Sequence, residues 1–256
     1  MTIVARLVSQ PAIIFAMRLA GAALMFLLQA GIARLWSVDL LGKYLLALAA
    51  INITACAMPL GFQTVGSYFA AEYWSADNRR NLSAFARRSF LHIAIVFALA
   101  LPLVLLYAAP IGGLLRLPAE ILAPGLIMAA ATAITFVNGS ILVGTRRPLT
   151  AFAADTLAKP LVMAAGFIAA SALFALDHRL VALIWTGALL YLAVALAHTA
   201  IVRATIKRIP DDREVTQEAA THAASSPLPG GERARVRGYG VQDAKDQAPS
   251  DTTRAG

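Results

Sequence analysis

Few side chains in this sequence have chemistry to offer, and five of them stand inside long apolar stretches. They are one cation, Arg18, and four amides: Gln29, Asn52, Gln63 and Asn138. A charge inside an apolar stretch is costly, so it usually faces a cavity or a partner. The planar fork of a guanidinium can also bind two oxygens of an anion at once. These five residues are therefore the candidates for binding a polar or anionic group within a membrane.

Their spacing groups them by helix face. Arg18 and Gln29 are eleven residues apart, which is about 20° around a helix of 3.6 residues per turn. Asn52 and Gln63 repeat that spacing. Asn138 follows Thr135 by three residues and adds a smaller polar patch. If each stretch is one helix, each pair shares a face.

Two residues between Asn52 and Gln63 disturb this simple picture. Pro59 lies on the same stripe, and Gly61 follows it closely. Either residue can break or kink a helix and free backbone groups where a cavity needs them.

Each candidate also has a plainer interpretation. Arg18 is about two turns from the edge of its stretch and could extend its head group to the interface. The amides could simply bond neighbouring helices, which contributes about 0.6 kcal/mol each. Thr135 could bond its own preceding turn.

The sequence gives little support for an enzymatic function. Catalysis by acid–base or metal chemistry needs paired carboxylates or histidines placed near them. No recognisable pair and no His–acid motif occurs among the six acids that precede residue 209, and Cys56 is the single cysteine. We therefore expect no catalytic residue, no metal and no cofactor. The six acids are Asp39, Glu72, Asp77, Glu120, Asp155 and Asp177.

The apolar stretches themselves predict the fold class. The chain has 256 residues, of which 59% are hydrophobic and 14% charged. A helix of about 20 apolar residues crosses a bilayer core, and only helices satisfy their own backbone groups in lipid over such lengths. We predict an all-α polytopic membrane protein whose six spans form one lobe over residues 1–208. The predicted spans are 7–33, 44–71, 89–109, 121–145, 160–176 and 180–202.

Basic residues orient these spans. Eleven lie on the N-terminal side of the predicted membrane, whereas Arg34, Lys43, Arg116 and Arg179 lie on the other. Because cytoplasmic connections carry the excess of Lys and Arg, both termini are expected in the cytoplasm. These cations also meet the head groups of anionic membrane lipid. The eleven are Arg6, Arg79, Arg80, Arg87, Arg88, Arg146, Arg147, Lys159, Arg203, Lys207 and Arg208.

The composition changes near Pro210. Residues 209–256 are rich in Pro, Gly, Ser, Thr, Asp and Arg and contain almost no aliphatic run. Such a segment buries too little apolar surface to offset its ordering entropy, so it is predicted to be a disordered cytoplasmic tail. A regulatory tail and a product of a lost reading frame are both open interpretations.

Three segments carry a resemblance to a known family. They read ARLWSVDLLGKYLLALAAI (33–51), LGFQTVGSYFAAEYWSADNRRNLSAFARRSF (60–90) and GTRRPLTAFAADTLAKPL (144–161). The first resembles the connection between the first two helices of bacterial polysaccharide exporters. These are the O-antigen, or lipid-linked oligosaccharide, flippases of the multidrug/oligosaccharidyl-lipid/polysaccharide superfamily. The other two resemble that family's first basic loop and its connection between helices four and five.

The resemblance implies a function and also a difficulty. It implies flipping of a lipid-linked oligosaccharide across the bacterial inner membrane for O-antigen-like polysaccharide biosynthesis. Members of the family have two similar six-helix lobes, whereas this sequence supplies one. A second lobe or a homodimer partner would therefore be required. The alternatives are a truncated, non-transporting remnant or assembly subunit and, with less support, an intramembrane sugar or acyl transferase. Nothing in the residues indicates a nucleic-acid partner.

Overall fold

The structure, a computed structural model, describes residues 3–209, with side chains from residue 10 onward. This part of the chain is helical and contains no strand. The predicted tail lies outside it, apart from Ile209. In chain order the helices are α1 (Ile3–Leu35), α2 (Val38–Ala57), α3 (Phe62–Ser75), α4 (Arg79–Leu106), α5 (Ala108–Leu115), the 3-10 turn η1 (Ala119–Ile121), α6 (Leu122–Gly144), α7 (Pro148–Ala153), the π-helical segment η2 (Ala154–Ala158), α8 (Lys159–Leu173) and α9 (Arg179–Ile206).

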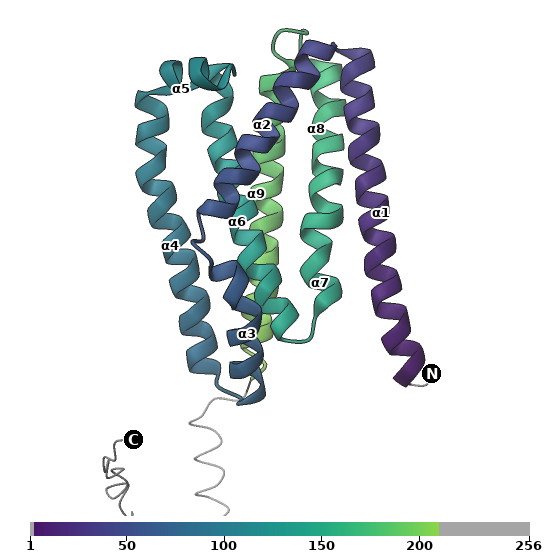
Figure 1. The fold of residues 1–256 in the computed structure, drawn as a ribbon, viewed down its shortest axis with the longest axis vertical. Coiled ribbons are helices and arrows are strands. Elements are labelled where there is room, and N and C mark those ends of the chain that lie inside the picture. The colour runs from purple at the N-terminus through teal and green to yellow at the C-terminus, as the bar shows by residue number, and fades with distance from the viewer. Residues whose placement is uncertain (1–2, 210–256) are drawn as a thin grey trace, which may run out of the picture. The chain divides into compact units, whose positions relative to one another are not determined.

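Six of the helical segments in the described part are long and apolar enough to cross a membrane. The prediction of an all-α multi-pass membrane protein is confirmed. The long helices run side by side, and their connections alternate between the two ends of the bundle (Figure 1). Large apolar side chains on the outside, such as Phe26 and Leu106, are mostly exposed, at 69% and 77%. Such side chains are stable only if lipid covers them.

The centre of the bundle is α6, which packs against α2, α3, α4 and α9. Small residues on α6 allow this: Ala129, Ala131 and Ala133 are fully buried. At its end, a Cβ on Gly144 would lie 2.6 Å from the backbone oxygen of Ser67 in α3. Helices in lipid associate through such close backbone approach, since lipid tails are as apolar as the side chains.

The second predicted span, 44–71, is wrong as one helix, because the chain breaks between α2 and α3. Pro59 has no N–H to give the carbonyl four residues earlier. Leu60 and Gly61 then take positive φ values of 43° and 90°. The break that Pro59 and Gly61 predicted is confirmed. The first half-helix starts earlier than expected, since Ser37 caps it by accepting from the Leu40 N–H at 3.1 Å.

The fifth helical segment also differs from its prediction of 160–176. A continuous run of α7, η2 and α8 extends from Pro148 to Leu173. The predicted span begins after Lys159 because it is defined as a stretch without charges. Asp155 and Lys159 are therefore expected in the loop before it. In the structure Asp155 and Lys159 are helical and lie inside the span. Assigning Lys159 to the basic loops was therefore wrong.

Candidate functional site

An ion pair lies inside the fifth helical segment. The Nζ of Lys159 is 4.0 Å from an Oδ of Asp155, one turn earlier. The Lys159 side chain is 12% exposed, whereas that of Asp155 is 45% exposed. A charge pair at membrane depth is rare and marks a functional site by default. We take this pair as the centre of the candidate site.

The lysine joins three helices. Its Nζ donates to Oδ1 of Asn52 on α2 at 3.1 Å. The same ammonium lies 5.6 Å from the ring centroid of Tyr191 on α9. Tyr191 is fully buried, so the cation rests on an aromatic face that water does not reach. Asp155, Asn52 and the Tyr191 ring together stabilise a cation that lipid alone would exclude.

The local backbone around the pair is irregular. Pro160 has no N–H to offer the carbonyl of Thr156, four residues earlier. The five residues before Lys159 form the π-helical segment η2, and the Lys159 N–H bonds to the Ala154 carbonyl. Such π turns are rare and often occur at functional sites, since the extra residue shifts side chains around the helix axis. The Thr156 carbonyl comes so close to Gly21 of α1 that a Cβ on Gly21 would collide with it.

Arg18 reaches the same region from α1. Its guanidinium carbon lies 4.9 Å from the ring centroid of Phe152 on α7. Together with Asp155 and Thr156 it lines a cavity of about 370 Å³ between α1 and η2. Arg18 is thus directed at the neighbouring helix, which favours the cavity interpretation over extension to the interface.

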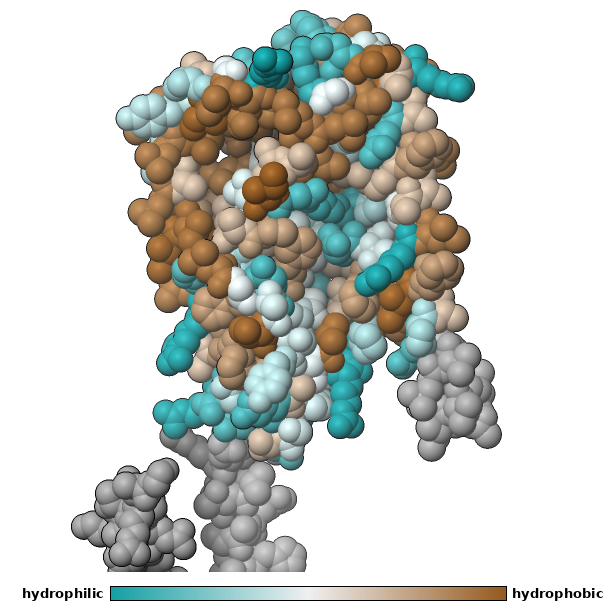
Figure 2. All heavy atoms as spheres, viewed as in Figure 1, coloured by the Kyte–Doolittle hydropathy of each residue, from teal (hydrophilic) through white to brown (hydrophobic). Residues whose placement is uncertain are grey.

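A second cavity, of about 470 Å³, opens on the other side of the same residues. Gln63 and Ser67 of α3 and Thr135 of α6 line it, and it shares Phe152 and Asp155 with the first cavity. The two cavities therefore have Phe152 and Asp155 in common. Figure 2 shows hydrophilic residues near the middle of the face turned to the viewer, with apolar surface on either side. We call the polar side chains that line the two cavities, Arg18, Gln63, Ser67, Thr135, Ser140, Asp155 and Thr156, the polar face.

The predicted site residues have different positions in this arrangement. Arg18 and Gln63 line cavities, and Asn52 binds Lys159. Asn138 is fully buried and donates to Oγ1 of Thr199 on α9 at 2.9 Å, so it joins two helices. Gln29 is half-buried on α1.

The structure corrects one prediction about these polar residues and agrees with another. Asn52 and Gln63 are not on one helix, because the break separates them; Gln63 Nε2 instead donates to the Cys56 carbonyl at 3.3 Å, near the end of α2. Thr135 does bond its own preceding turn, at the Ala131 carbonyl, as one interpretation predicted.

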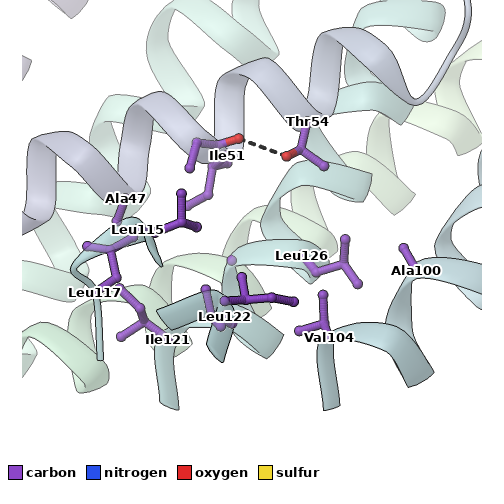
Figure 3. Close-up of a pocket in the computed structure, with 13 residues that line it drawn as sticks. Ala47, Ile51, Thr54, Ala100, Val104, Leu115, Leu117, Ile121, Leu122 and Leu126 are labelled. Atoms are coloured by element: carbon purple, nitrogen blue, oxygen red, sulfur yellow. Dashed lines mark hydrogen bonds between the residues drawn. The ribbon is translucent and has the colours of Figure 1, made fainter. Parts of the chain in front are cut away.

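A third cavity, between α2, α4, α5 and α6, has no comparable chemistry (Figure 3). Its volume is about 240 Å³ and its lining is almost wholly aliphatic. Its one polar side chain, Thr54, bonds to the Ala50 carbonyl at 2.8 Å. This cavity can hold hydrocarbon, but it cannot recognise a head group.

Sequence reasoning missed Asp155 and Lys159 as site residues. The available signal was their i, i+4 spacing in the segment DTLAK, which is the spacing of a helical ion pair. A search for paired carboxylates and for His–acid motifs does not reveal a pair of an acid with a lysine. Among residues 3–209, no three His, Cys, Asp or Glu side chains gather closely enough to hold a metal ion.

Comparison with known proteins adds no relative. No family model, no curated protein sequence and no solved structure matches this chain.

Proposed function

We propose that this chain is one lobe of a membrane transporter that flips a lipid-linked oligosaccharide for polysaccharide export. The observation that carries the proposal is the pair of cavities that share Asp155 in their linings, within the fifth membrane-spanning segment. Polar and charged groups at this depth destabilise a purely structural bundle. They have a use if a polar substrate passes there.

The charges suit an anionic head group. Arg18 has its guanidinium over an aromatic ring, at the wall of an open cavity. A guanidinium in such a place can bind two phosphate oxygens in a fixed geometry. Lys159 is held further inside and helps set the field around Asp155. In this proposal Arg18 contacts the pyrophosphate, and Gln63 and Asn52 lie along the path.

The polar face requires a partner. Asp155 is 45% exposed in a segment that lipid would surround. A second six-helix lobe, or a second copy of this chain, would cover the face and enclose the path. The same uncovered face also favours the alternative of a non-transporting remnant or assembly subunit, which would bind its partner there without moving a substrate.

The proposed location is the bacterial inner membrane with both termini in the cytoplasm. After Lys159 is removed from the count, ten basic residues lie on the N-terminal side and four on the other. The excess of cations still marks the cytoplasmic side.

The test is substitution of Arg18 in the source cell, where any second lobe is present. We expect Arg18→Ala to lower surface polysaccharide more than tenfold, since hydrogen bonds to charged groups contribute about 1.5–3 kcal/mol each. Lipid-linked oligosaccharide should accumulate inside. Arg18→Lys should retain part of the transport, because the charge remains and the fork does not.

The matched control is Arg34→Ala, which removes an exposed cation from the other end of the same helix. It should transport normally. Normal transport by a well-expressed Arg18→Ala protein would contradict the role of Arg18. Unchanged polysaccharide after deletion of the whole chain would favour the non-transporting remnant.

A further inference from the structure

A basic cleft lies away from the polar face, between α4 and α9. Its volume is about 620 Å³. It is lined by Arg79 and Arg87 of α4, by Arg203 of α9 and by Lys207 directly after that helix, and no carboxylate is among its described lining residues. Figure 1 places the start of α4 and the end of α9 at the same end of the bundle as the N-terminus. Three of these cations, Arg87, Arg203 and Lys207, are exposed.

The lining changes from basic to apolar with depth. Along α4, Arg79 and Arg87 come first, followed by Phe90, Leu91 and Ala94. At 1.5 Å per residue, Ala94 is about 22 Å along the helix from Arg79. On α9 the cations also lie within the last two turns. The cleft therefore offers charge at the membrane surface and an apolar wall below it.

We propose that this cleft binds an anionic phospholipid of the surrounding leaflet. The phosphate would lie among Arg87, Arg203 and Lys207, and an acyl chain would follow Leu91 and Ala94. Basic pockets between transmembrane helices bind such head groups. A soluble phosphate would occupy only the basic part of the cleft and would leave Leu91, which is 58% exposed, uncovered. The site is independent of the polar face and of the proposed transport.

The chain offers an unusually close control. Arg88 and Arg208 are neighbours of Arg87 and Lys207 in sequence and are also exposed, yet neither lines the cleft. Cations that serve only topology or the general surface potential should be equivalent at both sets of positions. If the cations form a specific lipid site, only those that line the cleft should affect binding.

The experiment is a lipid titration of the purified, delipidated full chain, followed by native mass spectrometry. The probes are phosphatidylglycerol and phosphatidylcholine. We expect the first phosphatidylglycerol to bind at least tenfold more tightly than phosphatidylcholine. Each removed cation near the surface should weaken binding about fivefold, so Arg87→Gln with Arg203→Gln should weaken it about 25-fold. Arg88→Gln with Arg208→Gln should change it less than twofold.

Three further arms identify the occupant. Ala94→Phe keeps every cation but blocks the acyl path, so it should weaken binding of phosphatidylglycerol. Millimolar inorganic phosphate should not displace the lipid. Removal of residues 210–256 should leave lipid affinity unchanged, although that segment carries acidic residues that could compete. Helical content measured by circular dichroism would verify that each variant is folded.

Several results would overturn the proposal. Equal losses of lipid affinity in the cleft variant and in the control at Arg88 and Arg208 would show that binding depends only on the general surface charge. Displacement by inorganic phosphate, or full affinity in Ala94→Phe, would exclude the acyl chain. Binding that appears only after removal of residues 210–256 would assign the cleft to that segment.

Discussion

Two ion pairs in this protein show how burial, rather than distance, decides the strength of a charge contact. Lys43 and Asp39, at the start of α2, are 2.7 Å apart, but their side chains are 39% and 73% exposed. Lys159 and Asp155 are 4.0 Å apart, yet the lysine is only 12% exposed and has further partners. Water and salt weaken the first pair. The second acts where the dielectric constant is low.

Double-mutant cycles should show that the buried Lys159, measured through its hydrogen bond to Asn52, couples more strongly than the exposed pair of Lys43 and Asp39. For Lys159→Met with Asn52→Ala, we expect a coupling free energy of about 1.5 kcal/mol, near the upper end of values for contacts between membrane helices. For Lys43→Met with Asp39→Ala, it should be below about 0.5 kcal/mol. Unfolding of the detergent-solubilised protein by a denaturing detergent measures both. Equal couplings would show that Lys159 is not held as the structure has it.

At the scale of elements, the π-helical segment η2 positions both Asp155 and the contact with α1. The Thr156 carbonyl approaches Gly21 so closely that no side chain fits between them. This contact holds α1 beside the cavity that Arg18 lines. A residue without a Cβ is needed at position 21 for this approach alone.

Gly21→Ala should therefore separate α1 from η2. We expect a loss of about 1–3 kcal/mol in unfolding free energy, because the added Cβ meets backbone that cannot rotate away. Gly42→Ala is the matched control, since nothing lies within 4 Å of its added Cβ. There, alanine should be neutral or stabilising by about 0.5–1 kcal/mol in a helix interior. Thermal unfolding in detergent compares the two, and equal midpoints would contradict the close approach.

The break between α2 and α3 depends on a different glycine. Gly61 has φ of 90° and open space around its missing side chain. Gly61→Ala should thus cost only the conformational strain, about 1–2 kcal/mol. The measurement is again the unfolding free energy of the solubilised protein. An unchanged value would show that the break tolerates another backbone geometry.

At the scale of the whole molecule, the ends of the bundle differ in charge. The turns at Asn78 and Arg146 lie at the basic end with the N-terminus, and α5 lies at the other end (Figure 1). Orientation in the membrane follows if that basic end is cytoplasmic.

Labelling of single cysteines would test the orientation. In a Cys56→Ser background, Gly113→Cys should react with an impermeant thiol reagent in intact cells, whereas Asn81→Cys should react only after lysis. Position 113 is exposed, with nothing within 4 Å of an added Cβ. Reaction at Asn81→Cys in intact cells, with none at Gly113→Cys, would reverse the orientation.

The all-α, multi-pass membrane fold of this protein can be predicted from local sequence alone. Hydrophobicity is a property of each stretch, and a run of apolar residues has to become a helix in lipid whatever its neighbours are. The same local logic located the break at Pro59 and Gly61, because a missing N–H and a positive φ act within one turn.

The partners of the charged side chains, in contrast, depend on how the helices pack. Arg18 was recognisable from its apolar surroundings, but its contact with Phe152 lies 134 residues along the chain. The sequence alone predicts a loop at Asp155 and Lys159, because a charged residue ends an apolar stretch. They remain helical since Asn52 and the Tyr191 ring, on two other helices, stabilise the ammonium inside the bundle. Such contacts depend on how helices pack, and spacing along the chain reports only neighbours within one helix.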